Sequence, residues 1–370
     1  MKHFPSFWIL ILYVVSSTAC INGEEKIGSV PEHIELYFPF NKSDYWDTIS
    51  PDLLGWDESQ ISPLLTFLEN NNTRAFILLK NGRIAVEAYF GNDLLGSPFQ
   101  ASSTWYWASA GKTLTAALLG IAQEENHLKL SDAASTYLGT GWTAMTQDQE
   151  QKITIWHQLT MTTGLDDRVS DNHCTDAVCL SFLASPGTRW AYHNAPYTLL
   201  DGVIENSTGQ DFDDYFNTRL RDPIGMDGFW TYIDYDHVYF STARSMARFG
   251  LLILAEGKWE GTGIISDPEY FRDMINTSQD LNLSYGYLWW LNGKASLMVP
   301  GFQAVISSSL TPNAPADMLA AMGKNGQLIN IVPSLELVMI RMGDNPDNSL
   351  VPVSFQNDLW EKLNKVIPSQ

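Results

Sequence analysis

The sequence has few cysteines, few basic residues and no long hydrophobic run. Its 370 residues include 3 Cys, and 22 Lys and Arg stand against 42 Asp and Glu. The net charge of −20 gives a surface that repels nucleic acid and anionic lipid, which excludes nucleic-acid-binding functions. The apolar run from Phe7 to Val15 is shorter than the roughly 20 residues of a membrane-spanning helix. Low-complexity tracts and repeats are also missing, which excludes a fibrous or disordered chain.

Two widespread catalytic motifs are missing as well. The chain contains no Gly-x-Ser-x-Gly, so the nucleophile elbow of the α/β-hydrolases is not present. It contains no His-Glu-x-x-His, the helical zinc motif of many metalloproteases. Any catalytic residues in this chain must therefore belong to a different motif.

The N-terminus has the pattern of a secretion signal. Lys2 gives a positive start, and the apolar run is followed by small residues up to Ala19. We therefore expect residues 1–19 to be a signal peptide. Residues 17–20, Ser-Thr-Ala-Cys, resemble a bacterial lipobox, although Ser17 replaces the usual Leu. We predict lipid on Cys20 and membrane attachment through it, and the alternative is plain cleavage after Ala19.

The other two cysteines are close in sequence. A lipidated Cys20 resolves the odd count, because Cys174 and Cys179 then remain as a pair suited to an oxidising compartment. We predict a disulfide between them, and the alternative is two buried free thiols. Signal and disulfide together predict an exported protein, periplasmic or membrane-anchored as a bacterial lipoprotein.

Hydrophobic periodicity divides the chain into an early and late sheet region and a helical middle. A helix is predicted from Glu58 to Asn70, and Asn81-Gly82 separates two strands of a hairpin. Further strands are expected at 285–291, 317–322, 327–332 and 337–342, before a closing helix at 354–366. The fold class is therefore α+β, an antiparallel sheet flanked by N- and C-terminal helices.

The same periodicity predicts the domain boundaries. After a linker at 20–50, a sheet lobe comprises residues 51–108 and 280–370, and a mainly helical lobe comprises residues 109–279. The chain is long enough for two such lobes.

One S-x-x-K tetrad, Ser109-Ala110-Gly111-Lys112, opens the predicted helical lobe. Residues three apart share a helix face, so the amine of Lys112 can reach the hydroxyl of Ser109. Burial and the positive end of the helix both favour a neutral amine, which can accept a proton. The alternative is a helix-capping Ser followed by a solvated Lys.

A second motif, Tyr192-His193-Asn194, follows the Pro-Gly turn at 186–187, where a loop can present polar side chains to a cleft. Tyr192 and Asn194 are thus candidates to flank the nucleophile. His157 and His193 are expected to be structural. Tryptophans near the motifs are expected either to line an acyl pocket or to pack in the core, namely Trp105, Trp107, Trp190, Trp289 and Trp290.

Together with Ile155–Leu165 and Ser241–Gly250, these motifs resemble the serine β-lactamase/penicillin-binding family. The likeness is strongest to class C β-lactamases and their relatives among D-alanyl-D-alanine peptidases, esterases and 6-aminohexanoate-dimer hydrolases, and it runs from about Phe76 to Met342. It implies a β-lactamase/transpeptidase-like fold and an acyl-enzyme mechanism without a metal or organic cofactor. By this resemblance Ser109 is the nucleophile, Lys112 and Tyr192 are its base and acid, and Asn194 contacts a substrate amide.

The family's third motif, Lys-Thr-Gly or His-x-Gly on a strand, is altered in this chain. Strand register favours Ala321-Met322-Gly323 as its equivalent, with Lys324 at the start of the following turn. In that register the backbone N–H groups of Lys324 and Ser109 form the oxyanion hole. Ala321 supplies no cation for a free carboxylate, and the side chain of Lys324 can point elsewhere.

We therefore predict an exported serine hydrolase acting on an ester or amide, with a small molecule or peptide as substrate. The enzymatic alternative is a penicillin-binding D-alanyl-D-alanine peptidase or a β-lactamase. The other alternative is a binding lipoprotein that kept the fold and lost catalysis. The presence of Ser109, Lys112 and Tyr192 argues against this last alternative, because binding alone needs none of the three.

Overall fold

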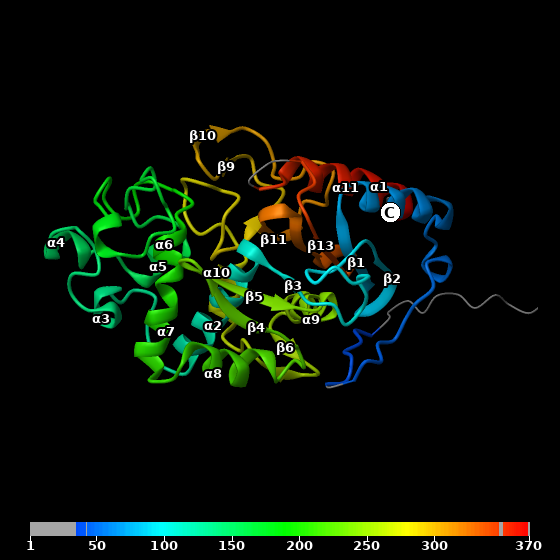
Figure 1. Cartoon of the computed structure of the whole chain (residues 1–370), viewed down its shortest axis with the longest axis horizontal. Coiled ribbons are helices and arrows are strands. Elements are labelled where there is room, and N and C mark those ends of the chain that lie inside the picture. The colour runs from blue at the N-terminus through cyan, green and yellow to red at the C-terminus, as the bar shows by residue number, and fades with distance from the viewer. Residues whose placement is uncertain (1–34, 42, 348–350, 369–370) are drawn as a thin grey trace, which may run out of the picture. The chain divides into compact units, whose positions relative to one another are not determined.

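The computed structural model describes residues 35–41, 43–347 and 351–368, which all belong to one compact unit (Figure 1). The predicted signal peptide and Cys20 lie outside the described residues. No helix within these described ranges is both long and apolar enough to cross a membrane.

The centre of the fold is an antiparallel sheet built from both ends of the chain. Its strands follow the order β2-β1-β13-β12-β11-β8. Their bounds are Thr73–Lys80 for β1, Arg83–Tyr89 for β2, Trp290–Leu291 for β8, Leu319–Gly323 for β11, Gln327–Val332 for β12 and Leu337–Gly343 for β13. The sheet of early and late strands predicted from the sequence is therefore confirmed, although β8 is much shorter than the strand expected at 285–291.

Helices cover both faces of this sheet. On β12, Ile329 faces α9 (Ala243–Leu254), where a Cβ on Gly250 would lie 3.2 Å from the Ile329 side chain. The next residue, Asn330, accepts a hydrogen bond from Trp360 of α11 (Val353–Val366) at 2.9 Å. Successive strand residues point to opposite faces, so α9 and α11 lie on opposite sides of the sheet. Burial on both faces explains why β11, β12 and β13 are apolar along most of their length.

The remaining helices lie mostly between the two sheet segments of the chain. The α-helices are α1 (Ile61–Asn70), α2 (Lys112–Glu124), α3 (Ser135–Leu138), α4 (Gln147–Glu150), α5 (Ile155–Leu159), α6 (Asn194–Thr198), α7 (Leu200–Thr208), α8 (Phe212–Phe216) and α10 (Pro268–Met274). α1 packs beside α11, and α2 runs through the interior with most of its side chains buried. By contrast, α9 packs on the sheet although its residues fall inside the range assigned above to the helical lobe.

Strands also occur within the helical middle of the chain. β3 (Trp105–Tyr106), β4 (Phe229–Ile233) and β5 (Asp236–Ser241) form a small sheet in the order β3-β5-β4. Smaller hairpins are made by β6 (Lys258–Trp259) with β7 (Thr262–Gly263), and by β9 (Leu297–Val299) with β10 (Phe302–Ile306). Periodicity did not predict β4 and β5, and their tight turn at Asp234 and Tyr235 borders the site described next.

The short helical turns complete the list of elements. They are η1 (Asp52–Leu54), η2 (Glu58–Gln60), η3 (Ala108–Gly111), η4 (Ala177–Cys179), η5 (Asn217–Arg221), η6 (Lys324–Gly326) and η7 (Pro333–Leu335). Two of them matter for the site: η3 carries Ser109, and η6 is the turn between β11 and β12.

Candidate active site

A pocket of about 670 Å³ brings together residues from distant parts of the sequence. It is lined by Ser109, Lys112, Tyr192, Asn194 and Lys324, which are five of the six catalytic and substrate-binding residues predicted above. The sixth, Gly323, ends the strand that immediately precedes Lys324. These residues come from η3, α2, the loop before α6, α6 itself and η6, so only the tertiary fold assembles them.

The nucleophile candidate sits in a constrained turn. Ala108, directly before Ser109, has a φ of 47°, in the left-handed region that alanine seldom adopts. Strand β11 ends against this turn, because a Cβ on Gly323 would lie 2.5 Å from the carbonyl oxygen of Trp107 and 3.0 Å from the amide nitrogen of Ala110. Only glycine permits this approach, which brings the start of η6 next to Ser109.

Lys112 lies at the first position of α2 and is only 4% exposed. Its Nζ lies 3.7 Å from the centre of the Tyr197 ring and 5.6 Å from that of Tyr192. Burial lowers the pKa of Lys112 to about 8, against the opposing effect of the negative charges of Asp236 and Asp201. A substantial fraction of the amine is therefore neutral near pH 8 and can accept a proton.

Tyr192 is held in place by aromatic packing. Its ring stacks on Trp290 at a centroid distance of 6.1 Å and meets Tyr285 edge-on at 6.4 Å. Burial raises the pKa of Tyr192 well above its usual range, while a hydrogen bond with Ser109 acts in the opposite direction. The phenol thus stays protonated at neutral pH, in direct contact with the nucleophile candidate.

Asn194 is linked to two residues that sequence reasoning missed. Its Nδ2 lies 3.1 Å from Nε2 of His173, and Nδ1 of His173 lies 2.7 Å from a carboxylate oxygen of Asp236. Both His173 and Asp236 line the pocket. The sequence feature that could have indicated His173 is its position directly before Cys174. No sequence feature indicated Asp236, because periodicity does not predict the β4–β5 hairpin that carries it.

The turn after β11 is fixed from two sides. Asn325 donates a hydrogen bond through Nδ2 to the hydroxyl of Tyr106 at 2.7 Å, and Arg341 donates to the carbonyl of Gly326 at 3.0 Å. Ala321 is fully buried, as expected for a strand residue with no part in binding charge. Lys324, free in the sequence analysis to point elsewhere, is among the residues that line the pocket, and its charge acts to lower the pKa of Asp236.

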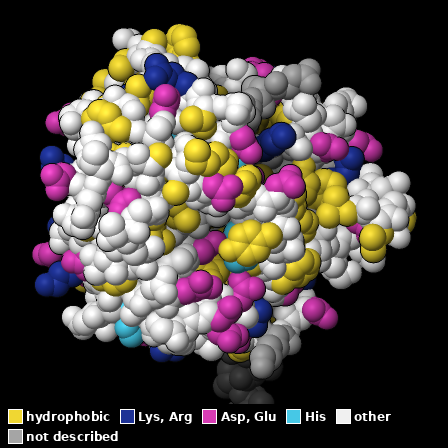
Figure 2. All heavy atoms as spheres, turned by 60° about the vertical axis from the view of Figure 1, so that its left-hand side comes forward, with side chains coloured by type: hydrophobic (Ala, Val, Ile, Leu, Met, Phe, Trp, Pro, Cys, Tyr) yellow, Lys and Arg dark blue, Asp and Glu magenta, His cyan; other side chains and the backbone are white. Residues whose placement is uncertain are grey.

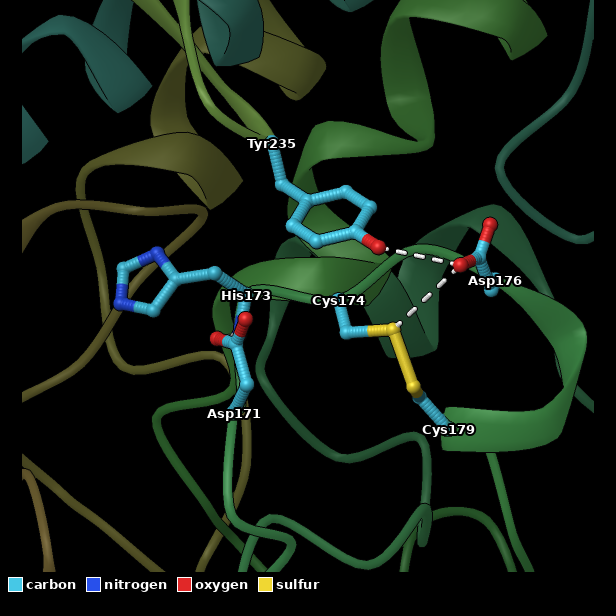
Figure 3. Close-up of a disulfide and its surroundings, with 6 residues drawn as sticks. All are labelled: Asp171, His173, Cys174, Asp176, Cys179 and Tyr235. Atoms are coloured by element: carbon cyan, nitrogen blue, oxygen red, sulfur yellow. Dashed lines mark hydrogen bonds between the residues drawn. A yellow bond between two sulfur atoms is a disulfide. The ribbon is translucent and has the colours of Figure 1, made fainter.

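Across the pocket, a disulfide-bridged loop meets the tip of the β4–β5 hairpin (Figure 3). Cys174 and Cys179, the pair expected from the sequence, are joined by a disulfide in the structure. Within this loop Asp176 accepts a hydrogen bond from the hydroxyl of Tyr235 at 3.0 Å. Figure 3 shows the ring of His173 directed away from the disulfide. The loop is therefore anchored on one side while His173 reaches the pocket on the other.

Charge near the pocket is predominantly negative. Asp171, Asp234 and Asp236 line it, against Lys112 and Lys324. The molecular face in Figure 2 likewise carries more Asp and Glu than Lys and Arg side chains. A substrate with several negative charges would meet an unfavourable field here.

The tryptophans and histidines near the motifs lie outside the pocket lining. All five tryptophans are at most 4% exposed and none lines the pocket, so they pack in the core. His157 accepts a hydrogen bond from the backbone N–H of Thr154 at 3.0 Å and caps α5. His193 is 2% exposed and, like His157, does not line the pocket.

Comparison with known proteins gives a family model and distant relatives. The model described as Beta-lactamase matches residues 73–342. Protein flp of Staphylococcus aureus (strain COL) is 25% identical over 53% of this chain and 40% of its own length. A beta-lactamase of Escherichia coli (strain K12) is 28% identical over 36% of each chain. The chain spans about two fifths or less of the length of these curated relatives.

A similar solved structure covers far more of the molecule. A putative 6-aminohexanoate-dimer hydrolase from Bacillus anthracis superposes with a TM-score of 0.65 over 88% of this chain and 89% of its own, at 21% identity. At this identity the likeness establishes the fold alone. The predicted fold class, an antiparallel sheet with terminal helices and a helical insertion, is confirmed.

Proposed function

Because the chain belongs to the beta-lactamase family of serine hydrolases, we propose that it hydrolyses an ester or amide through an acyl-enzyme formed on Ser109. One observation carries the proposal: Ser109, Lys112 and Tyr192 share a pocket in which burial lowers the pKa of Lys112 to about 8. A solvated Lys that merely followed a helix cap would keep its ordinary pKa.

In the first half-reaction the Ser109 hydroxyl attacks the substrate carbonyl carbon and gives its proton to the neutral amine of Lys112. The negative charge that develops on the carbonyl oxygen is stabilised by the backbone N–H groups of Ser109 and Lys324. The tetrahedral intermediate then collapses, and the leaving alcohol or amine takes a proton through Tyr192. The product of these steps is an ester of Ser109 and the free leaving group.

In the second half-reaction water attacks the acyl-enzyme. The water gives a proton to the same Lys112 and Tyr192 pair, and the intermediate releases the carboxylic acid as Ser109 recovers its proton. Lys112 and Tyr192 thus serve as base and acid in turn, which requires that neither is permanently charged at working pH. The directions of their two pKa shifts support this arrangement.

The direct test uses labelling and turnover. We expect a fluorophosphonate probe to label wild-type protein and not Ser109→Ala, and butyrate ester hydrolysis to disappear in the same variant. Unchanged ester hydrolysis in Ser109→Ala would refute the mechanism. A wild-type protein that neither labels nor hydrolyses any ester or amide would favour the non-catalytic binding protein.

One observation favours a second candidate, a penicillin-binding peptidase or β-lactamase. Lys324 lines the pocket and could pair with a substrate carboxylate in place of the cation missing at Ala321. Asp236 weakens this pairing, because the Asp236 carboxylate already interacts with the positive charge of Lys324. Covalent labelling by fluorescent penicillin that Ser109→Ala abolishes would support this candidate, and no labelling at high concentration would exclude it.

We also propose that the protein is exported and anchored through Cys20 as a bacterial lipoprotein. The Cys174–Cys179 disulfide supports an oxidising compartment. Mass spectrometry of the mature N-terminus is the test: a diacylglyceryl group on Cys20 is expected, and an unmodified Cys20 would contradict the anchor.

A further inference from the structure

The aromatic ring of Tyr197, in α6, lies against the amine of Lys112. Nζ of Lys112 is 3.7 Å from the centre of the Tyr197 ring, and 5.6 Å from that of Tyr192. Tyr197 is 5% exposed and lines the pocket together with Lys112. The negative face of an aromatic ring attracts a cation within about 6 Å of its centre, and more strongly where water is excluded. The mechanism proposed above uses Tyr192 and makes no use of this closer contact.

The Tyr197 ring is attached to the fold at both of its ends. Its hydroxyl lies 3.2 Å from Oγ1 of Thr115, a fully buried residue of α2. Thr115 follows Lys112 by three positions, so the two side chains share a face of that helix. At the other end, Gln158 donates a hydrogen bond at 2.8 Å to the carbonyl of Pro196, the residue before Tyr197. The ring is therefore held from α2 and from α5 while its face is turned to the amine.

The chemistry of Tyr197 distinguishes it from an acid or a base. Burial raises the pKa of Tyr197 well above its usual range, so the phenol stays neutral at working pH. Its hydroxyl is already engaged by Thr115. What Tyr197 offers to Lys112 is therefore the face of its ring, which attracts the ammonium and has no comparable effect on the neutral amine.

We propose that Tyr197 is a positioning residue for the proposed base, and that its ring face holds the Lys112 ammonium in the pocket that it shares with Ser109. The inference rests on the proposed hydrolase function. When the Ser109 O–H bond breaks, the proton moves to Nζ, and the ammonium formed there carries the charge that the ring attracts. When the proton leaves Nζ, the attraction is lost, so the ring stabilises the charged state through which both half-reactions pass.

Other groups also act on the charge of Lys112. The titratable groups beside it or in the same pocket are Tyr192, Asp236 of β5 with its partner His173, Asp201 of α7 with its partner His237, and Lys324. The two carboxylates favour the ammonium, and burial opposes it. A substitution of Tyr197 leaves all of these groups in the chain, so a resulting change in the pKa of Lys112 reports on the ring.

The test compares Tyr197→Leu with Tyr197→Phe, which keeps the ring and removes only the hydroxyl. The kcat/KM for p-nitrophenyl butyrate should rise with pH as Lys112 loses its proton. In Tyr197→Leu the ammonium loses the ring, so the midpoint of this rise should move to lower pH by about one unit. The plateau should fall at least about tenfold, because the amine is no longer held in place. Tyr197→Phe should keep the midpoint within about 0.3 units and the plateau within about threefold of wild type.

Three outcomes would overturn the proposal. These are a midpoint in Tyr197→Leu that stays in place, one that moves to higher pH, or a change in Tyr197→Phe as large as that in Tyr197→Leu. The last result would assign the effect to the hydroxyl instead of the ring. A wild-type protein that does not hydrolyse the ester would count against the proposed hydrolase, and the contact is then tested without turnover.

That measurement is a titration of the Lys112 side chain itself. In ¹H–¹³C spectra of protein labelled with ¹³C-lysine, the Lys112 Hε–Cε signal is identified by its loss in Lys112→Met. We expect wild type and Tyr197→Phe to show Hε resonances shifted upfield by the ring and a midpoint near pH 8. In Tyr197→Leu the upfield shift should vanish and the midpoint should fall by about one unit. Equal midpoints in all three proteins, or no upfield shift in wild type, would contradict the contact even if no substrate were known.

Discussion

The two walls of the pocket are built in different ways. The wall that we propose for catalysis, the catalytic wall, comprises Ser109, Lys112 and Tyr192. It stands on an interior helix and a packed aromatic cluster, and Lys112 and Tyr192 are 4% and 8% exposed. The loop wall, residues 171–179 and 234–237, is held by a disulfide and polar side-chain contacts, and the side chains of His173 and Asp236 are 42% and 36% exposed. Burial adjusts proton affinity on the first wall, while hydrogen bonds set orientation on the second.

This difference in construction suits the buried wall to proton transfer and the loop wall to substrate binding. Desolvation is what lowers the pKa of Lys112, so the proposed base has to be buried. A binding wall must instead leave polar atoms open to the substrate, and loops on a rigid scaffold do this best. Changes on the catalytic wall should therefore affect every substrate, and changes on the loop wall should affect selectivity.

The largest effect is expected from Lys112→Met, which keeps an unbranched apolar side chain and removes the base. We expect kcat/KM on p-nitrophenyl butyrate to fall by about 10² to 10⁴, the usual contribution of a general base. Thermal unfolding followed by circular dichroism checks that the variant remains folded. Activity within tenfold of wild type, in a folded variant, would mean that Lys112 is not the base.

Gly323→Ala should have the next largest effect. The added Cβ would meet the Trp107 carbonyl at 2.5 Å, so β11 must shift away from the turn that carries Ser109. A displacement of this kind costs on the order of 10²-fold in kcat/KM. Gly111→Ala, in the same turn, is the matched control, because its Cβ would find its nearest neighbours at an ordinary 3.7 Å. Equal losses in both variants would contradict the specific role of the close approach at Gly323.

The pH dependence of ester hydrolysis tests whether a charge on the loop wall changes the pKa of Lys112 on the catalytic wall. Ester hydrolysis should rise with pH and level off above about 8, because the base form of Lys112 has lost its proton. The charge of Asp236 raises the pKa of Lys112, so Asp236→Asn should lower this pKa and move the rising limb to lower pH. Asp234→Asn, which also lines the pocket, is the control and should leave the limb in place. A shift of the rising part of the profile to higher pH in Asp236→Asn would contradict the claim that the charge of Asp236 raises the pKa of Lys112.

The smallest effect on chemistry is expected from the double variant Cys174→Ser/Cys179→Ser. Removing the cross-link should lower the free energy of unfolding by on the order of 2 kcal/mol, measured by urea denaturation. Hydrolysis of p-nitrophenyl butyrate should stay within about threefold of wild type, because neither cysteine is among the residues that we propose for catalysis. A loss as large as that of Lys112→Met would erase the distinction between the two walls.

The sequence predicted the catalytic wall better than the loop wall, for a physical reason. Ser109 and Lys112 are one helical turn apart, so their proximity follows from local geometry alone. The central strands also follow from local patterns, such as the Asn81-Gly82 turn between β1 and β2. The Pro-Gly turn made Tyr192 and Asn194 candidates, and the family resemblance gave them roles, although no local rule connects them to Ser109.

His173 and Asp236 could not be paired from the sequence, because 63 residues separate them and no local spacing brings them together. The β4–β5 hairpin that carries Asp236 has no Gly at its turn, and Asp234 itself adopts a positive φ of 54°. The position of the Lys324 side chain likewise depends on how η6 is held by Arg341 and Tyr106. These contacts are tertiary, so local sequence patterns do not predict them.

The most direct test of the account is the site of acylation. Protein mixed with p-nitrophenyl butyrate and quenched in acid within the first turnover should gain the mass of one butyryl group, and peptide mapping should locate it on Ser109. Butyryl transfer to a different residue, or steady ester hydrolysis with no acylated Ser109 at any quench time, would contradict the acyl-enzyme mechanism.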